Sequence, residues 1–211
     1  MLSSTAHAGR YRAAAVGAIV GGLLRLAIAA AFAITGLGAA GDLPYGTFSR
    51  LTFLPSAALM LGMTALYGAV AHLLPRTGRL GVLVSLVGLV MSTVGELGGQ
   101  WLAFPRSGNF LIAPGAILTM SGLAAFAATA RRSGLPSGLS VWAFVIALFP
   151  VGFFPLAVGI HVVAGGAFPP SLDDNYFRVL YVIVGLLWIL FGAVLLGESK
   201  RHRERRLRES V

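Results

Sequence analysis

Hydrophobic residues run along the chain in six long blocks, separated by short stretches that contain polar residues, proline or glycine. The blocks cover residues 13–35, 53–74, 80–104, 110–130, 139–163 and 176–197. Each is about 20–25 residues long, enough for a helix rising about 1.5 Å per residue to cross ~30 Å of hydrocarbon. The pattern therefore predicts an all-α fold, a polytopic bundle of six transmembrane helices.

The connections between the blocks are too short to hold a soluble domain. They include residues 76–79, 106–109 and 131–138. The composition agrees, with 57% hydrophobic and 11% charged residues. We expect a short N-terminal segment (1–12), one transmembrane domain (13–197) and a basic tail (198–211).

Positive residues gather in the segments that lie on one side of the expected bundle. These are Arg10, Arg12, Arg76, Arg79, Arg131, Arg132, Lys200, Arg201, Arg203, Arg205, Arg206 and Arg208. Because cytoplasmic loops carry the excess of Lys and Arg, both termini are expected in the cytoplasm and the chain in the bacterial inner membrane as a multi-pass protein. The basic tail then rests on anionic lipid headgroups, and no nucleic acid partner is expected.

Small residues mark the faces on which two of the blocks should meet other helices. In the first block, Gly17, Gly21 and Arg25 follow one another at four-residue spacing and share a face. In the third, the stripe consists of Gly81, Ser85, Gly88, Ser92, Gly95, Glu96, Gly99 and Gln100. Small residues allow close helix approach in lipid, so both faces should point into the bundle.

Arg25 and Glu96 are the only charges well inside the blocks, and they have opposite signs. An ionisable group at membrane depth is expensive and suggests a functional site. If burial dominates, the Glu96 carboxyl group keeps its proton and can act as a general acid; if Arg25 pairs with it, it is a fixed anion. The sequence leaves both possibilities open.

The fifth block contains Pro150, Gly152 and Pro155 near its middle, which predicts a kink or a short unwound stretch. Irregular backbone at that depth is compatible with a packing helix or with the wall of a cavity. Together with the polar groups, the expected substrate-binding residues are Arg25, Gln100, Trp101, Phe149, Phe153 and Phe154.

No cofactor or metal site is expected. His72 lies near one end of its block and His161 near the opposite end, so the two cannot share a haem iron. A metal ion needs several converging ligands, and no such cluster occurs in the blocks.

The motif residues Phe110-Leu111, Pro114-Gly115, Arg132–Pro136 and Leu139–Trp142 resemble a pattern in an uncharacterised family of six-span bacterial integral membrane proteins. This resemblance implies topology alone. In size and style the chain is also similar to the small integral-membrane terpene cyclases, which protonate an isoprenoid olefin or epoxide with a buried acid. Those enzymes generally use two acids, whereas only Glu96 lies within a block here.

The leading functional hypothesis is a small membrane enzyme that acts on a lipophilic, isoprenoid-like substrate in an intramembrane cavity. Glu96 is the expected general acid, with aromatic side chains stabilising positive charge. The alternatives are a proton- or anion-coupled small-solute transporter, in which Glu96 and Arg25 form the site, and a structural subunit without a ligand.

Overall fold

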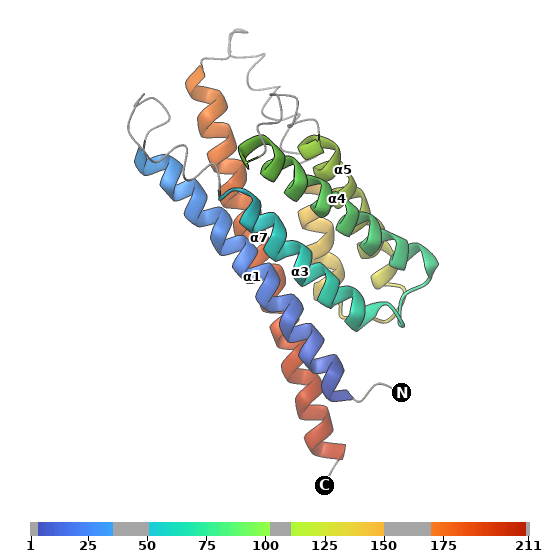
Figure 1. The fold of residues 1–211 in the computed structure, drawn as a ribbon. Coiled ribbons are helices and arrows are strands. Elements are labelled where there is room, and N and C mark those ends of the chain that lie inside the picture. The colour runs from blue at the N-terminus through green and yellow to red at the C-terminus, as the bar shows by residue number, and fades with distance from the viewer. Residues whose placement is uncertain (1–3, 36–50, 102–110, 150–169, 210–211) are drawn as a thin grey trace.

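The computed structural model describes residues 4–35, 51–101, 111–149 and 170–209, and these residues form six helices and no strand. The helices are α1 (Ser4–Thr35), α3 (Phe53–Val70), α4 (Arg76–Trp101), α5 (Ile112–Ala130), the helix Ser137–Phe149 and α7 (Pro170–Glu209) (Figure 1). The predicted all-α fold is confirmed for the described residues.

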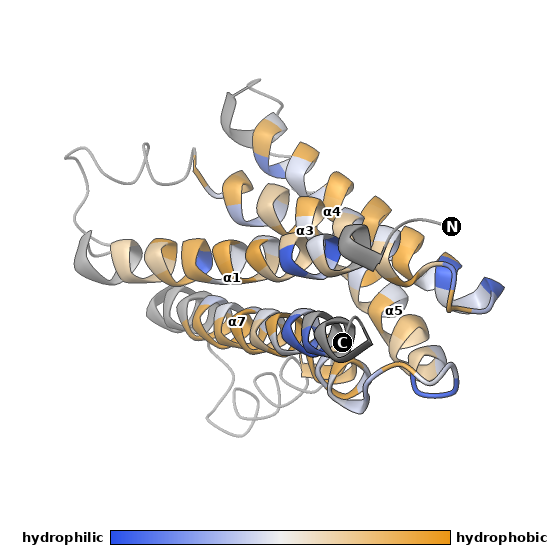
Figure 2. Cartoon of the chain, turned by 90° about the horizontal axis from the view of Figure 1, so that it is seen from below, coloured by the Kyte–Doolittle hydropathy of each residue, from blue (hydrophilic) through white to orange (hydrophobic). Residues whose placement is uncertain are grey.

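Four helical segments are long and apolar enough to cross a membrane: Ala8–Ala31, Phe53–Val70, Arg76–Gly98 and Val179–Arg201. Two shorter apolar segments, Pro114–Ala130 and Ser137–Phe149, accompany them. Hydrophobic residues dominate the helices, and hydrophilic ones gather near the start of α4, the turn after α5 and the end of α7 (Figure 2). The described helices therefore indicate a membrane protein.

Several helices differ in length from the hydrophobic blocks. α1 begins at Ser4, and α7 continues through the expected basic tail to Glu209. The basic stretch 76–79, expected as a connection, forms the first turn of α4, where the Arg79 N–H donates to the Pro75 carbonyl. Hydrophobicity marks the part of a helix suited to lipid, whereas the backbone hydrogen bonds continue into its polar ends.

The helices pack as two groups. α1 lies against α7 and α3, α4 lies against α5, and α3 makes the contact between the groups. The first residues of α1 and the last of α7 lie at the same end of the bundle (Figure 1).

Glycines allow the close approach of α1 to both of its neighbours. A Cβ atom at Gly17 would lie 2.5 Å from the Cα of Gly62 in α3. A Cβ atom at Gly22 would lie 2.5 Å from the Gly185 carbonyl oxygen in α7. The backbones meet directly at these points, as small-residue interfaces in lipid permit.

The α4–α5 interface is also packed closely at glycines, and it contains an interhelical hydrogen bond in addition. A Cβ atom at Gly81 would lie 2.8 Å from the Gly122 carbonyl oxygen, and one at Gly115 would lie 2.7 Å from that of Gly88. Between these crossings, the Ser85 hydroxyl donates to the Thr119 carbonyl at 3.0 Å. The small-residue face predicted for the third block is therefore confirmed as a helix-packing face.

A tight turn reverses the chain after α5. Gly134 has a φ of 72°, and the Leu135 N–H donates to the Ala130 carbonyl at 3.2 Å. This is a Schellman-type helix end, which requires a residue in the left-handed region and favours glycine there. The turn directs the helix Ser137–Phe149 back along the bundle.

Candidate functional site

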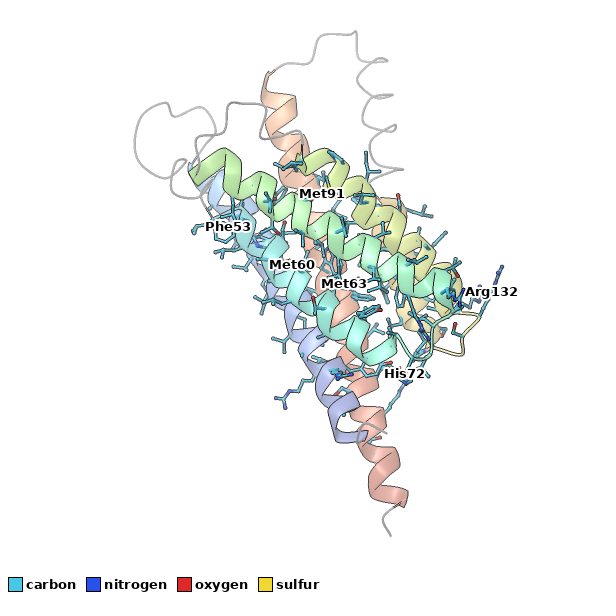
Figure 3. All side chains as sticks on the ribbon, turned by 45° about the vertical axis from the view of Figure 1, so that its right-hand side comes forward. Phe53, Met60, Met63, His72, Met91 and Arg132 are labelled. Atoms are coloured by element: carbon cyan, nitrogen blue, oxygen red, sulfur yellow. The ribbon has the colours of Figure 1, made fainter. Side chains whose placement is uncertain are left out.

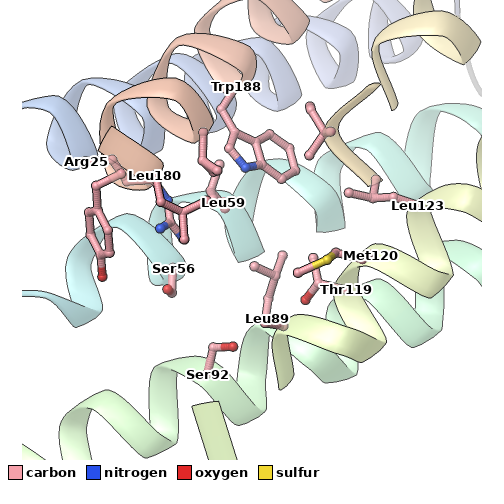
Figure 4. Close-up of a pocket in the computed structure, with 14 residues that line it drawn as sticks. Arg25, Ser56, Leu59, Leu89, Ser92, Thr119, Met120, Leu123, Leu180 and Trp188 are labelled. Atoms are coloured by element: carbon pink, nitrogen blue, oxygen red, sulfur yellow. The ribbon is translucent and has the colours of Figure 1, made fainter. Parts of the chain in front are cut away.

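A cavity of about 160 Å³ lies where the two groups of helices meet (Figure 4). All six described helices contribute to its wall. The lining residues are Arg25, Ser56, Leu59, Leu89, Ser92, Ala116, Thr119, Met120, Leu123, Ile146, Leu180, Tyr181, Val184 and Trp188.

Most of the residues that line the cavity are apolar, and several of them are buried by packing against the rest of the bundle. Leu59 and Leu123 are almost fully buried, and Trp188 is 3% exposed. The Trp188 ring packs edge-on against Phe191, with 5.7 Å between the ring centroids. Trp188 faces Leu89, Thr119 and Met120 across the space (Figure 4). Such a surface suits an apolar ligand body.

Arg25 and Ser56 lie at one end of the cavity, whereas Thr119 lies near Met120 (Figure 4). The Arg25 guanidinium carbon lies 5.2 Å from the centroid of the Tyr181 ring, which is cation–π geometry. Ser56 from α3 and Ser92 from α4 belong to the same wall. Glu96 follows Ser92 by one helical turn and is 9% exposed. The helices therefore bring a cation, a carboxyl group and two hydroxyl groups to one end of an apolar cavity.

Three buried polar atoms at this end have no hydrogen-bond partner within the described part of the chain. They are Arg25 Nε, Ser56 Oγ and Glu96 Oε2. Leaving a buried donor or acceptor unpaired costs about 1–3 kcal/mol, and more for a charged group. Most buried polar atoms in folded proteins are hydrogen-bonded, so three unpaired ones require an explanation.

Arg25 and Glu96 interact without forming an ion pair. Arg25 lies close enough to the Glu96 carboxyl group to act on it electrostatically, and the Ser56 hydroxyl lies beside the same carboxyl group as a hydrogen-bond neighbour. The ion pair that the described residues do contain lies elsewhere, between Arg201 and Glu198 at 2.8 Å. Of the two possibilities left open by the sequence, a direct Arg25–Glu96 ion pair is not formed, although the two groups interact.

Phe149 is the one other expected binding residue whose side chain the structure describes. Phe149 belongs to the helix Ser137–Phe149 but is not among the residues that line the cavity. The side chains of Gln100 and Trp101, the residues Phe153 and Phe154, and the expected kink at 150–155 lie outside the described residues.

The sequence analysis missed three important wall residues. Tyr181 and Trp188 are seven residues apart and share a face of α7, a spacing that could have been noticed. Ser56 is one of a few hydroxyl residues in an apolar block, and such residues usually bond to their own helix. Its place beside Arg25 and Glu96 depends on how three helices pack.

The structure describes the side chain of one of the two histidines considered for haem binding. His72 follows the end of α3 and is exposed, at the same end of the bundle as Arg132 (Figure 3). His161 lies outside the described residues. Within the described ranges, no three His, Asp or Glu side chains come together as metal ligands.

Comparison of the chain with protein-family models, curated protein sequences and solved structures found no match. The functional argument therefore depends on the geometry of the site.

Proposed function

We propose that this chain is a multi-pass protein of the bacterial inner membrane that binds a small lipophilic molecule between its helices and acts on it with Glu96 as general acid. The observation that supports this proposal best is the apolar cavity, whose polar end lies beside a buried carboxyl group. Ligand sites combine such an apolar wall with a few converging polar groups.

The proposed topology has six transmembrane helices with both termini in the cytoplasm. The ends of α1 and α7 lie together, and the basic turn after α5 lies toward the same end (Figure 1). Exposed basic residues near the end of α7, such as Lys200 and Arg201, are available to anionic lipid headgroups. Tags at both termini should be inaccessible in intact cells and accessible after permeabilisation; a tag labelled from outside contradicts this topology.

The cavity volume limits the size of the ligand that can bind. A protein cavity of about 150 Å³ holds a benzene molecule, so about 160 Å³ accommodates one ring or a short branched chain. A long isoprenoid would extend beyond the cavity between the helices. The proposed substrate is therefore a small olefin or epoxide.

The proposed reaction is a proton-initiated isomerisation. Glu96 gives its proton to the olefin carbon or the epoxide oxygen, and the carbocation that forms closes or rearranges. Tyr181 and Trp188 present aromatic faces that stabilise the positive charge. The sequence had suggested this role for Trp101, Phe149, Phe153 and Phe154. The Glu96 carboxylate then takes a proton from a neighbouring carbon, which restores the acid and balances the reaction.

Substitution of Glu96 by Gln tests the reaction. Glu96→Gln keeps the shape of the side chain but removes the acidic proton, so turnover of small olefins and epoxides should fall by about 10²–10⁴-fold while ligand binding persists. Product formation in reconstituted membranes is followed by gas chromatography and mass spectrometry. Wild-type turnover per folded molecule in this variant excludes Glu96 as the acid.

A second pair of variants tests the cavity. Ala116 lines the cavity, whereas Ala128 lies on the exposed face of the same helix. Ala116→Phe should fill the cavity and abolish ligand binding, and Ala128→Phe should leave binding unchanged. Equal binding in the two variants would place the ligand elsewhere.

The opposite charges of Arg25 and Glu96 at one site also favour a transporter of a small solute coupled to protons or anions. Flux assays in proteoliposomes distinguish the two functions. Solute uptake that is abolished in Glu96→Gln, without any chemical product, supports transport. A protein with no ligand, product or flux is a structural subunit.

A further inference from the structure

We propose that the cavity recognises a neutral hydroxyl group, held between Arg25, Ser56 and Glu96, so that its ligand is a small alcohol or phenol with an apolar body. This inference rests on the proposed binding function and names the chemical class of the ligand. Under the proposed function, such an alcohol or phenol is either the product formed when the enzyme opens an epoxide or a substrate that already carries a hydroxyl group.

The unpaired hydroxyl of Ser56 is the first reason. Other hydroxyl residues in these helices donate to a carbonyl four residues earlier: Thr64, Ser85, Thr93, Thr119, Ser121 and Thr129. Ser56 is 1% exposed, lines the cavity and has no such partner in the described part of the chain. Its hydroxyl lies beside the Glu96 carboxyl group rather than on its own helix, where it can bond to a group inside the cavity.

The second reason is the kind of hydrogen bond, donated or accepted, that each of the three unpaired atoms can form. Arg25 Nε can only donate a hydrogen bond, and Ser56 Oγ can donate or accept one. Glu96 Oε2 can only accept one once the carboxyl group has given its proton to the substrate. A ligand hydroxyl accepts from Arg25 and donates to Glu96 at the same time. A group that only donates or only accepts leaves one of the two unpaired.

The charges at the polar end are the third reason. The site contains one cationic and one acidic side chain, which together favour neither an anion nor a cation strongly. A ligand carboxylate would lie beside Glu96, and a ligand ammonium group beside Arg25. A neutral hydroxyl avoids both repulsions, and the apolar wall around Trp188 accepts the ring or chain that carries it.

Three probes of similar size test the inference: p-cresol, p-xylene and 4-methylbenzoate. They share a methyl-substituted ring and differ in the head group, which is a hydroxyl, a methyl or a carboxylate. Binding is measured by equilibrium dialysis against nanodiscs with and without the wild-type protein, so that partitioning into lipid is subtracted. We expect saturable binding of p-cresol at least tenfold tighter than that of p-xylene or 4-methylbenzoate, because buried polar groups stay unpaired without the hydroxyl.

Matched variants test which residues recognise the hydroxyl group of the ligand. Ser56→Ala should lower the preference for p-cresol over p-xylene severalfold. Ser121→Ala, whose exposed hydroxyl bonds to the Ile117 carbonyl, should leave the preference unchanged. Ala116→Phe should remove saturable binding of both probes.

The outcomes separate this inference from the proposed function. Equal affinity for the three probes, or tighter binding of 4-methylbenzoate, overturns hydroxyl recognition but leaves ligand binding in place. Absence of saturable binding for all three overturns both. A preference for p-cresol that survives in both Ser56→Ala and Ala116→Phe places the hydroxyl outside this cavity and also overturns the inference.

Discussion

The glycine interfaces and the cavity lie in the same bundle but are built in opposite ways. At the α4–α5 interface, backbones touch at Gly81–Gly122 and Gly88–Gly115, and the hydroxyl groups of Ser85 and Thr119 bond to nearby carbonyls. At the cavity, larger side chains hold the helices apart, and polar atoms remain unpaired. Close packing fixes each group of helices, and the junction between the groups contains the cavity in which we propose that a ligand binds.

The difference shows which small and polar residues determine structure and which are available for function. Serine and threonine residues at or near the interfaces bond to carbonyls, as Ser85 does. Ser56, at the junction, has no bond of this kind among the described residues. A polar residue without a structural partner is therefore the better indicator of a site in such a bundle.

The largest effect is expected from enlarging a glycine within an interface. A Cβ atom at Gly122 would collide with the Gly81 carbonyl and with Ser85, so the α4 and α5 backbones would have to separate. We expect Gly122→Ala to lower the free energy of unfolding by about 3 kcal/mol or more, at the upper end of overpacking costs. Unfolding in mixed micelles measures this change.

Gly9→Ala is the matched control, because a Cβ atom there meets nothing within 4 Å. Its free energy of unfolding should stay constant or rise by up to about 1 kcal/mol, as expected for alanine replacing glycine in a helix. If Gly122→Ala is as stable as Gly9→Ala, the glycine interfaces are not close-packed.

A smaller effect is expected from the charges beside the cavity. Arg25→Met and Glu96→Gln should each lower the free energy of unfolding by about 1–3 kcal/mol, since each removes one partner of an interaction between buried polar groups. Because the two groups interact without an ion pair, the coupling energy in a double-mutant cycle should be about 0.5–1 kcal/mol. Strict additivity would show no interaction, and coupling of 3 kcal/mol or more would indicate the direct ion pair that the structure lacks.

The smallest effect is expected from the hydroxyl link between α4 and α5. Ser85→Ala removes the bond to the Thr119 carbonyl and should cost about 0.6 kcal/mol, the average for interhelical hydrogen bonds in membrane proteins. Ser121→Ala removes only a bond within α5 and should change the free energy of unfolding less. A loss above about 2 kcal/mol for Ser85→Ala would mean that this bond, rather than glycine packing, holds the interface.

Much of the fold could be predicted from local patterns. The hydrophobic blocks located the described helices, and the stripe from Gly81 to Gly95 correctly indicated a packing face, which meets α5. Both signals depend on residues within one helix. The helix ends at Ser4 and Glu209 were missed because polar residues can continue a helix beyond its apolar part.

The site could be predicted only in part. Arg25 and Glu96 were identified because charges are rare in apolar blocks, and the structure brings them near one another. Ser56, Tyr181 and Trp188 could not be chosen from many similar residues, since their importance depends on the packing of α3 and α7 around Arg25. Which helices become neighbours is a property of the whole bundle.

The most direct test of the central claim is a crystal structure of the protein soaked with p-bromophenol, with the bromine located by its anomalous scattering. The account predicts a bromine peak among Met120, Leu123 and Trp188, with the phenol hydroxyl toward Arg25 and Ser56. Bromine found only on the outer, lipid-facing surfaces, with ordered water in the cavity, would contradict it.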